Sequence, residues 1–171
     1  MNSYHSGRFE WFVVATVIAI ISAVALGRYL AMADDAQNLR LEILSHRLVT
    51  AAANARAEFL VKGLSQSQTR SLPIAGQPVY FSSQGWPVAV TAPVTEGFRL
   101  QEADCVALWN LLLQNPPPLG LESRPEHKAE YVLSVGDSVC RFQLHEAATF
   151  FDYYPLEGRV IFSRGSISGN L

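Results

Sequence analysis

The sequence predicts an α+β protein in which a long N-terminal helix, transmembrane over its first half, packs on a small antiparallel sheet. Three observations predict this fold. An uncharged apolar run lies near the N-terminus, and no Pro or Gly interrupts the chain between Arg28 and Gly63. In the C-terminal half, two segments of alternating apolar residues flank the turn Gly136-Asp137-Ser138. An unbroken periodic segment is typical of a helix, and alternation around a Gly-containing turn is typical of a β-hairpin.

The apolar run extends from Trp11 to Gly27 without a charged residue. As a helix it would be about 25 Å long, and flanking aromatic residues bring it close to the ~30 Å of a bilayer core. Basic side chains at its ends, Arg8 and Arg28, suit the two interfaces. We therefore predict a transmembrane helix over residues 9–30, with residues 1–8 as a short tail. The predicted membrane-anchor side chains are Trp11, Phe12, Val13, Val14, Ile18, Ile20, Ile21 and Leu26.

A cleaved signal peptide is the competing interpretation of the same segment. Ala31-Met32-Ala33 has the small-x-small form of a cleavage site, and cutting there would release a secreted soluble domain. Against cleavage, Arg8 and Glu10 nearly cancel in charge, and Arg28 lies between the apolar run and the site. The run also exceeds the usual length of about 7–15 apolar residues in a signal peptide. The sequence favours the anchor.

Two cysteines, Cys105 and Cys140, are the only ones in the chain. Behind an export signal, a pair of cysteines is expected to form a disulfide, since disulfides persist in oxidising compartments. The pair and the short N-terminal tail together favour an orientation with the N-terminus in the cytoplasm and the domain outside it.

The helix is predicted to continue beyond the membrane over residues 31–62, ending at Gly63. Apolar residues recur there at three-to-four spacing, which marks one helix face. We expect this face to pack on the protein's own domain. Its predicted members are Met32, Ala36, Leu39, Ile43, Leu48, Ala51, Ala55 and Phe59.

The remaining residues, 63–171, are predicted to form the α+β domain. Turn signatures and apolar periodicity predict its elements. They are a loop at 64–76, strands at 79–82 and 88–92, a helix at 102–114, an extended loop at 119–128, hairpin strands at 131–135 and 139–144, a strand at 159–163 and a frayed tail at 165–171. Cys140 would point from the hairpin into the core, toward the helix that carries Cys105.

Composition and motifs give no support to nucleic-acid binding or catalysis. The net charge is −2 and the 13 Lys and Arg residues are scattered, so no basic patch for nucleic acid exists. None of the four histidines has a metal-ligand partner at the right spacing, and phosphate-loop and nucleophile-elbow motifs are absent. We expect no catalytic residue, no cofactor, no metal and no small-molecule substrate. Asp34-Asp35 is most simply a solvated helix face.

Six aromatic residues leave a second function open. They could form the ligand surface of a membrane-tethered binding or sensing module, although core packing explains them more simply. A solvent-facing cavity lined by them would favour the module. The six are Trp86, Trp109, Phe150, Phe151, Tyr153 and Tyr154.

The chain resembles the type IV pilins and minor pilins. Ser82-Ser83-Gln84-Gly85-Trp86-Pro87 resembles the Gly-aromatic-Pro turn that follows the first helix in many of them, and the segment from Phe150 to Phe162 resembles their late Tyr…Gly-x-Val signature. The cysteine pair is similar to the pilin disulfide. Among pilus-operon products, the combination most resembles the protein F family of mannose-sensitive haemagglutinin (MSHA) pilus biogenesis. The resemblance implies an inner-membrane, periplasm-facing assembly protein, with pilins and inner-membrane pilus assembly proteins as partners.

The N-terminus departs from the prepilin pattern, which has Gly followed by an aromatic residue and Glu at the fifth mature position. Here Gly7 precedes Arg8, Glu10 falls at the third position and Phe12 at the fifth. We therefore expect an unprocessed relative or assistant of pilins. Glu10 and Arg8 remain its candidate subunit-docking residues.

Overall fold

The computed structural model describes residues 4–64, 69–124, 129–145 and 148–163, with side chains for all but 4–9, 30–31 and 33–37 of these. The chain divides into two compact units, Met1–Leu39 and Arg40–Leu171, which are described separately below. The tail predicted at 165–171 lies outside the described residues.

Helix α1 (Tyr4–Val61) confirms the predicted long helix. It ends where Gly63 adopts a left-handed conformation (φ 66°) and donates its N–H to the Leu60 carbonyl at 3.0 Å. In the second unit, its buried face is a stripe at three-to-four spacing. The stripe consists of Leu41, Leu44, Leu48, Ala52, Ala55 and Phe59.

This stripe corrects the predicted helix face. Leu48, Ala55 and Phe59 are buried as expected, and Ala51 is half-buried. Ile43 is 43% exposed, because it lies about 200° around the helix from the buried Leu41. In the first unit, Met32 and Leu39 of the predicted face are 68% and 53% exposed, and the Ala36 side chain lies outside the described part.

The first sheet has three antiparallel strands: β1 (Ser71–Ile74), β2 (Gln77–Phe81) and β3 (Pro87–Ala89). A register shift between Tyr80 and Phe81 interrupts the β2–β3 pairing. The predicted loop at 64–76 is wrong for β1. Pro73 indicates a loop in the sequence, but Pro is tolerated in a strand at the edge of a sheet. The turn at Ala75-Gly76 has positive φ at both residues (47° and 82°), which suits a tight hairpin.

Helix α2 (Glu102–Leu112) follows, two residues shorter than predicted. Leu113 is extended and Asn115 has a positive φ of 52°, so the helix ends before the three prolines at 116–118. At its start, Gln101 and Asp104 form a reciprocal capping box.

The second sheet has five strands in the order β4-β5-β6-β7-β8. Its hairpin, β5 (Tyr131–Val135) and β6 (Cys140–Leu144), was predicted and pairs Leu133 with Phe142. Strand β8 (Arg159–Ser163) was also predicted. Strand β7 (Phe150–Tyr154) forms from an aromatic run that shows no alternation.

Strand β4 (Leu119–Leu121) corrects the predicted extended loop at 119–128, of which residues 125–128 lie outside the described part. It pairs parallel to β5, so this sheet is not purely antiparallel. Gly120 permits the close approach, since a Cβ there would lie 2.8 Å from Ala129 Cβ.

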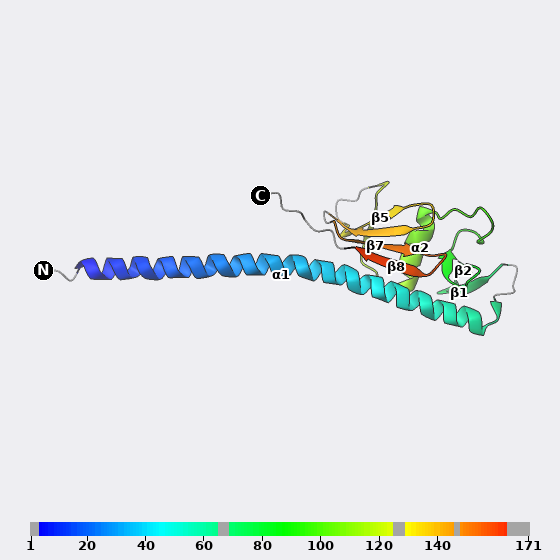
Figure 1. Ribbon diagram of the computed structural model, residues 1–171, viewed down its shortest axis with the longest axis horizontal. Helices are drawn as coiled ribbons and strands as arrows, with labels where there is room; N and C mark the ends of the chain where they lie inside the picture. Colours follow the sequence, from blue (N-terminus) through cyan, green and yellow to red (C-terminus); the bar gives the residue numbers. More distant parts are fainter. Residues whose placement is uncertain (1–3, 65–68, 125–128, 146–147, 164–171) are drawn as a thin grey trace. The chain divides into compact units, whose positions relative to one another are not determined.

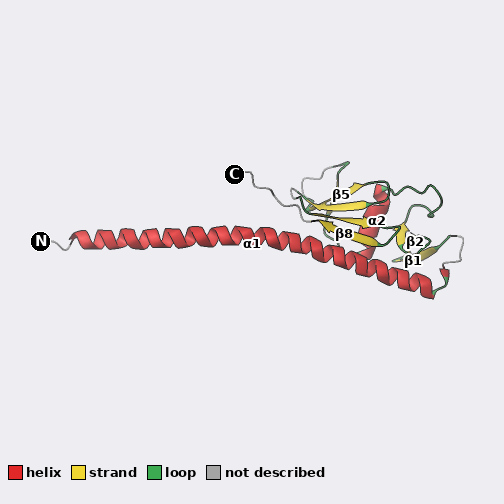
Figure 2. Ribbon diagram, in the orientation of Figure 1, coloured by secondary structure: helices red, strands yellow, loops and turns green. Residues whose placement is uncertain are grey.

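Alternate residues of β5, β6 and β7 form the core of the second unit together with α2. Trp109 of α2 is fully buried, and its ring stacks 4.7 Å from that of Phe142. Figure 1 shows α2 lying against the strands labelled β5 and β7, and Figure 2 shows the same layers by type of structure. The predicted α+β class is therefore confirmed, with two sheets in place of one.

Candidate functional site

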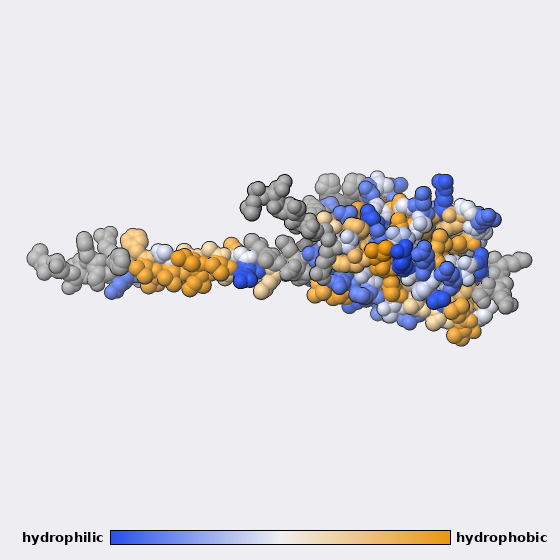
Figure 3. All heavy atoms as spheres, in the orientation of Figure 1, coloured by the Kyte–Doolittle hydropathy of each residue, from blue (hydrophilic) through white to orange (hydrophobic). Residues whose placement is uncertain are grey.

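The apolar segment occupies the first unit and is the clearest functional feature of the chain. Residues Glu10–Tyr29 have a mean hydropathy of 2.1 and none of the segment is buried. By length and composition it could cross a membrane. The eight predicted anchor residues are 47–78% exposed, so no protein core explains their hydrophobicity. Figure 3 shows mostly hydrophobic surface along this stretch on the face in view.

The two candidate docking residues lie at the start of this segment. Glu10 is exposed on α1, and the side chain of Arg8 lies outside the described part. Their role in docking stays a prediction.

Charges placed inside the segment should displace the protein from the membrane. We expect Ile18→Arg combined with Ile21→Arg to lower the membrane-bound fraction, because each Arg near the bilayer centre costs about 3 kcal/mol. The measurement is quantitative fractionation of cells into membrane and soluble proteins. Val61→Arg combined with Leu156→Arg adds the same charge at exposed sites of the second unit and should leave the fraction unchanged. Equal fractions for both pairs would contradict an anchor.

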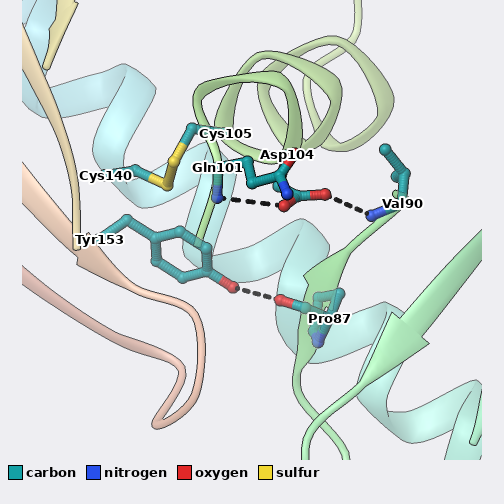
Figure 4. The surroundings of a disulfide bond; sticks show 7 residues. All are labelled: Pro87, Val90, Gln101, Asp104, Cys105, Cys140 and Tyr153. Atoms are coloured by element: carbon teal, nitrogen blue, oxygen red, sulfur yellow. Dashed lines mark hydrogen bonds between the residues drawn. A yellow bond between two sulfur atoms is a disulfide. The ribbon is translucent and has the colours of Figure 1, made fainter. Parts of the chain in front are cut away.

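The disulfide predicted between Cys105 and Cys140 is present. Both residues are fully buried, with their Cα atoms 5.8 Å apart. The bond ties α2 to β6, as Figure 4 shows. Its presence is consistent with folding in an oxidising compartment.

Beside the disulfide, the buried carboxylate of Asp104 anchors the loop between β3 and α2. One oxygen accepts the N–H groups of Val90 and Thr91 at 3.0 Å and the Thr91 hydroxyl at 2.8 Å. The other accepts the Gln101 N–H at 3.2 Å. All these donors belong to the loop between β3 and α2 or to its end, so Asp104 has a structural role. Sequence analysis did not identify this role, although an acidic residue at the third position of a helix is the signal that could have indicated it.

The two sequence motifs that carry the pilin resemblance contact each other. Gly158 has a positive φ of 66°, and a Cβ at that position would overlap the Trp86 indole. The Tyr153 hydroxyl donates to the Pro87 carbonyl at 3.3 Å. We call the pair Trp86 and Gly158, with this hydrogen bond, the Trp86–Gly158 junction. Sequence reasoning identified each motif but not their contact.

Helix α1 also contacts this junction. The Arg56 guanidinium lies 4.6 Å from the Trp86 ring centroid and donates to the Gln84 carbonyl at 3.0 Å. One turn further on, Phe59 stacks on Phe81 with centroids 4.4 Å apart. The C-terminal part of α1 is therefore held by the Trp86 motif and the adjacent end of β2.

The junction should be sensitive to one methyl group. We expect Gly158→Ala to lower the free energy of unfolding by at least about 2 kcal/mol, since Ala disfavours positive φ by about 1 kcal/mol and overpacking adds at least as much. Gly76→Ala is the matched control, because it has positive φ but no atom within 4 Å of the added carbon. Urea unfolding of the full chain in non-ionic detergent would measure both. Equal losses would show that Trp86 does not pack on Gly158.

The aromatic residues do not form one open surface. Trp109, Phe151 and Tyr153 are fully buried in the core. The other three, Trp86, Phe150 and Tyr154, are half-buried. Each of these has an arginine guanidinium 4.1–4.6 Å from its ring centroid, from Arg56, Arg141 and Arg159 respectively.

Two buried tyrosines and one ion pair stabilise the second unit. Burial, reinforced by Glu130, raises the pKa of Tyr131 to about 12, and burial also raises the pKa of Tyr153. Both phenols therefore stay neutral at physiological pH. Arg141 forms a two-pronged ion pair with the nearly buried Asp152 at 2.7 and 2.8 Å. Among the residues that the structure describes, no three His, Cys, Asp or Glu side chains lie close enough to hold a metal ion.

Comparisons with protein-family models, with curated proteins and with solved structures each found no match to this chain.

Proposed function

We propose that this chain is a non-enzymatic, membrane-anchored component of type IV pilus biogenesis, of the MSHA type. It acts as a pilin-like assembly protein or minor subunit, held in the inner membrane with its domain in the periplasm. Its helix associates with other helices in the bilayer, and its domain contacts pilins and inner-membrane pilus assembly proteins.

The main support for the proposal is that α1 contributes both to the apolar segment and to the domain core. One helix supplies the unburied apolar segment Glu10–Tyr29 and also a stripe of core residues from Leu41 to Phe59. A simple tether would end outside the domain core, since its only task is to reach the membrane. A helix shared between bilayer and core is what a pilin-like architecture requires.

The Trp86–Gly158 junction gives independent support. Two motifs selected for their resemblance to pilins, about 70 residues apart in the chain, meet at one contact that also engages α1. The membrane-tethered sensing module has less support, because three of the six aromatics proposed as its ligand surface are fully buried.

Deletion of the gene in a piliated host tests the proposal. We expect fewer or shorter pili by electron microscopy, restored by the full chain. A second complementation replaces residues 1–30 with an unrelated single-pass anchor. This chimera should restore pili poorly, because the proposed function needs the native helix in the bilayer. Unchanged pilus number and length after deletion would refute the proposal.

A further inference from the structure

A groove of about 700 Å³ lies between α1 and the end of α2. We call it the α1–α2 groove. Its α1 wall is formed by residues between positions 43 and 54, and its α2 wall by residues 112–115. Positions 43, 47, 50, 51 and 54 share one face over three helical turns, about 16 Å of length.

The groove combines apolar lining residues with the Arg47 cation at its rim. Ile43 and Ala51 line the α1 side, and Leu112 and Leu113 line the α2 side. Ile43 is 43% exposed there. Removing such a side chain from water is favourable, so the walls suit an apolar partner surface.

The rim carries His46 and Arg47, and none of the groove's lining residues is acidic. Both are exposed, and neither side chain forms a hydrogen bond or ion pair with another described residue. By contrast, Arg40, Arg141 and Arg159 are each paired with a carboxylate. Among the described residues, the Arg47 guanidinium thus has no carboxylate partner, and it lies one helical turn from the exposed Ile43.

We propose that the α1–α2 groove binds an amphipathic helix of a partner protein that carries carboxylates beside its apolar face. Apolar side chains of the partner contact Ile43 and Ala51, and its carboxylates pair with Arg47 and accept a hydrogen bond from His46. The small Ala51 allows a helix to approach closely, and the length of the wall matches three turns of helix. The inference rests on the proposed function only for the identity of the partner as a pilus assembly protein.

Site-specific crosslinking in the native host tests the groove. A photoreactive phenylalanine replaces Ile43 in the full chain, and the crosslinked peptide is identified by mass spectrometry. The same probe at Leu156, an exposed residue outside the groove, is the background control. We expect a probe-specific crosslink to a peptide of another protein that has at least two Asp or Glu residues on one predicted helix.

Charge reversal then tests the recognition. We expect His46→Glu with Arg47→Glu to reduce the crosslink at least about fivefold, because opposed charges at a rim weaken association. Arg99→Glu with Arg124→Glu removes two exposed arginines outside the groove and should leave the crosslink unchanged. Replacing the partner's acidic residues with Lys should restore crosslinking to the reversed chain. Since His46 and Arg47 have no described partners, the reversed chain should keep the wild-type melting temperature.

Several results would overturn the inference. They are no crosslink above the Leu156 background, a crosslinked peptide without acidic residues, a crosslink to a second copy of this chain, or equal sensitivity to both charge-reversal pairs. The two proposals fail separately. If deletion reduces piliation but charge reversal does not change the groove crosslink, the proposed assembly function is supported and the groove proposal is refuted.

Discussion

Loss of the disulfide is expected to lower the free energy of unfolding of the domain by about 3–4 kcal/mol. The bond closes a loop of 35 residues, and the chain-entropy model gives this magnitude for the unfolded state that it constrains. Because a domain of this size is stabilised by only about 5–15 kcal/mol, the loss should lower its melting temperature by about 10 °C or more.

Cys105→Ala with Cys140→Ala, measured by calorimetry of the full chain in non-ionic detergent, provides the test. Each single substitution serves as a control for unpaired thiols, since it leaves one buried cysteine. Both cysteines are fully buried, so a reducing agent should cleave the bond only after denaturant opens the domain. A double variant as stable as the wild type would contradict the role assigned to the bond.

Trp109→Ala is expected to lower the free energy of unfolding by about 3–5 kcal/mol, more than any other single substitution proposed for this protein. Trp109 is fully buried between α2 and the second sheet, and its ring contacts those of Tyr131, Phe142 and Phe151. The Nε1–H also donates to the Pro117 carbonyl at 3.2 Å, which fixes the segment after α2.

Two further variants separate the contributions of Trp109. Trp109→Phe loses the hydrogen bond and part of the side-chain volume but keeps an aromatic ring. It should therefore lower the free energy of unfolding less than Trp109→Ala does. Trp86→Ala, at a half-buried ring, should cost less than Trp109→Ala. Calorimetry of all three would check this order. If the Trp86→Ala variant were less stable than the Trp109→Ala variant, Trp109 would not be the central residue of the core.

The elements that sequence periodicity predicted correctly are those with a strong local signal. α1 has no breaker between Arg28 and Gly63, and the β5–β6 hairpin alternates around a glycine turn. The disulfide followed from the number of cysteines and an export segment. In each case the local sequence and the tertiary structure favour the same conformation.

The elements that were missed depend on tertiary contacts. Strand β4 has three residues and exists because Gly120 allows it to lie beside β5. Strand β1 contains Pro73, which argues against a strand in the sequence but is tolerated at the edge of a sheet. The predicted buried face of α1 wrongly included Ile43. Apolar residues lie on both sides of the helix, and periodicity alone does not say which side packs on the domain.

Contacts between distant motifs were also beyond sequence reasoning. The turn at Trp86 and the strand signature ending at Phe162 were each identified, yet nothing local indicates that Trp86 packs on Gly158. Likewise, the α1–α2 groove lies at the end of α2, which ends at Leu112, two residues earlier than predicted. Such features come from packing between segments far apart in the chain.

The mature N-terminus, determined by mass spectrometry of the protein purified from the membrane fraction, tests the central claim most directly. An unprocessed, membrane-anchored pilin relative should retain residues upstream of Arg8 together with the whole apolar segment. A mature chain that begins at Asp34 would contradict this account, because the anchor would then be a removed signal peptide. A chain that begins at Arg8 would contradict the unprocessed state and identify a processed pilin.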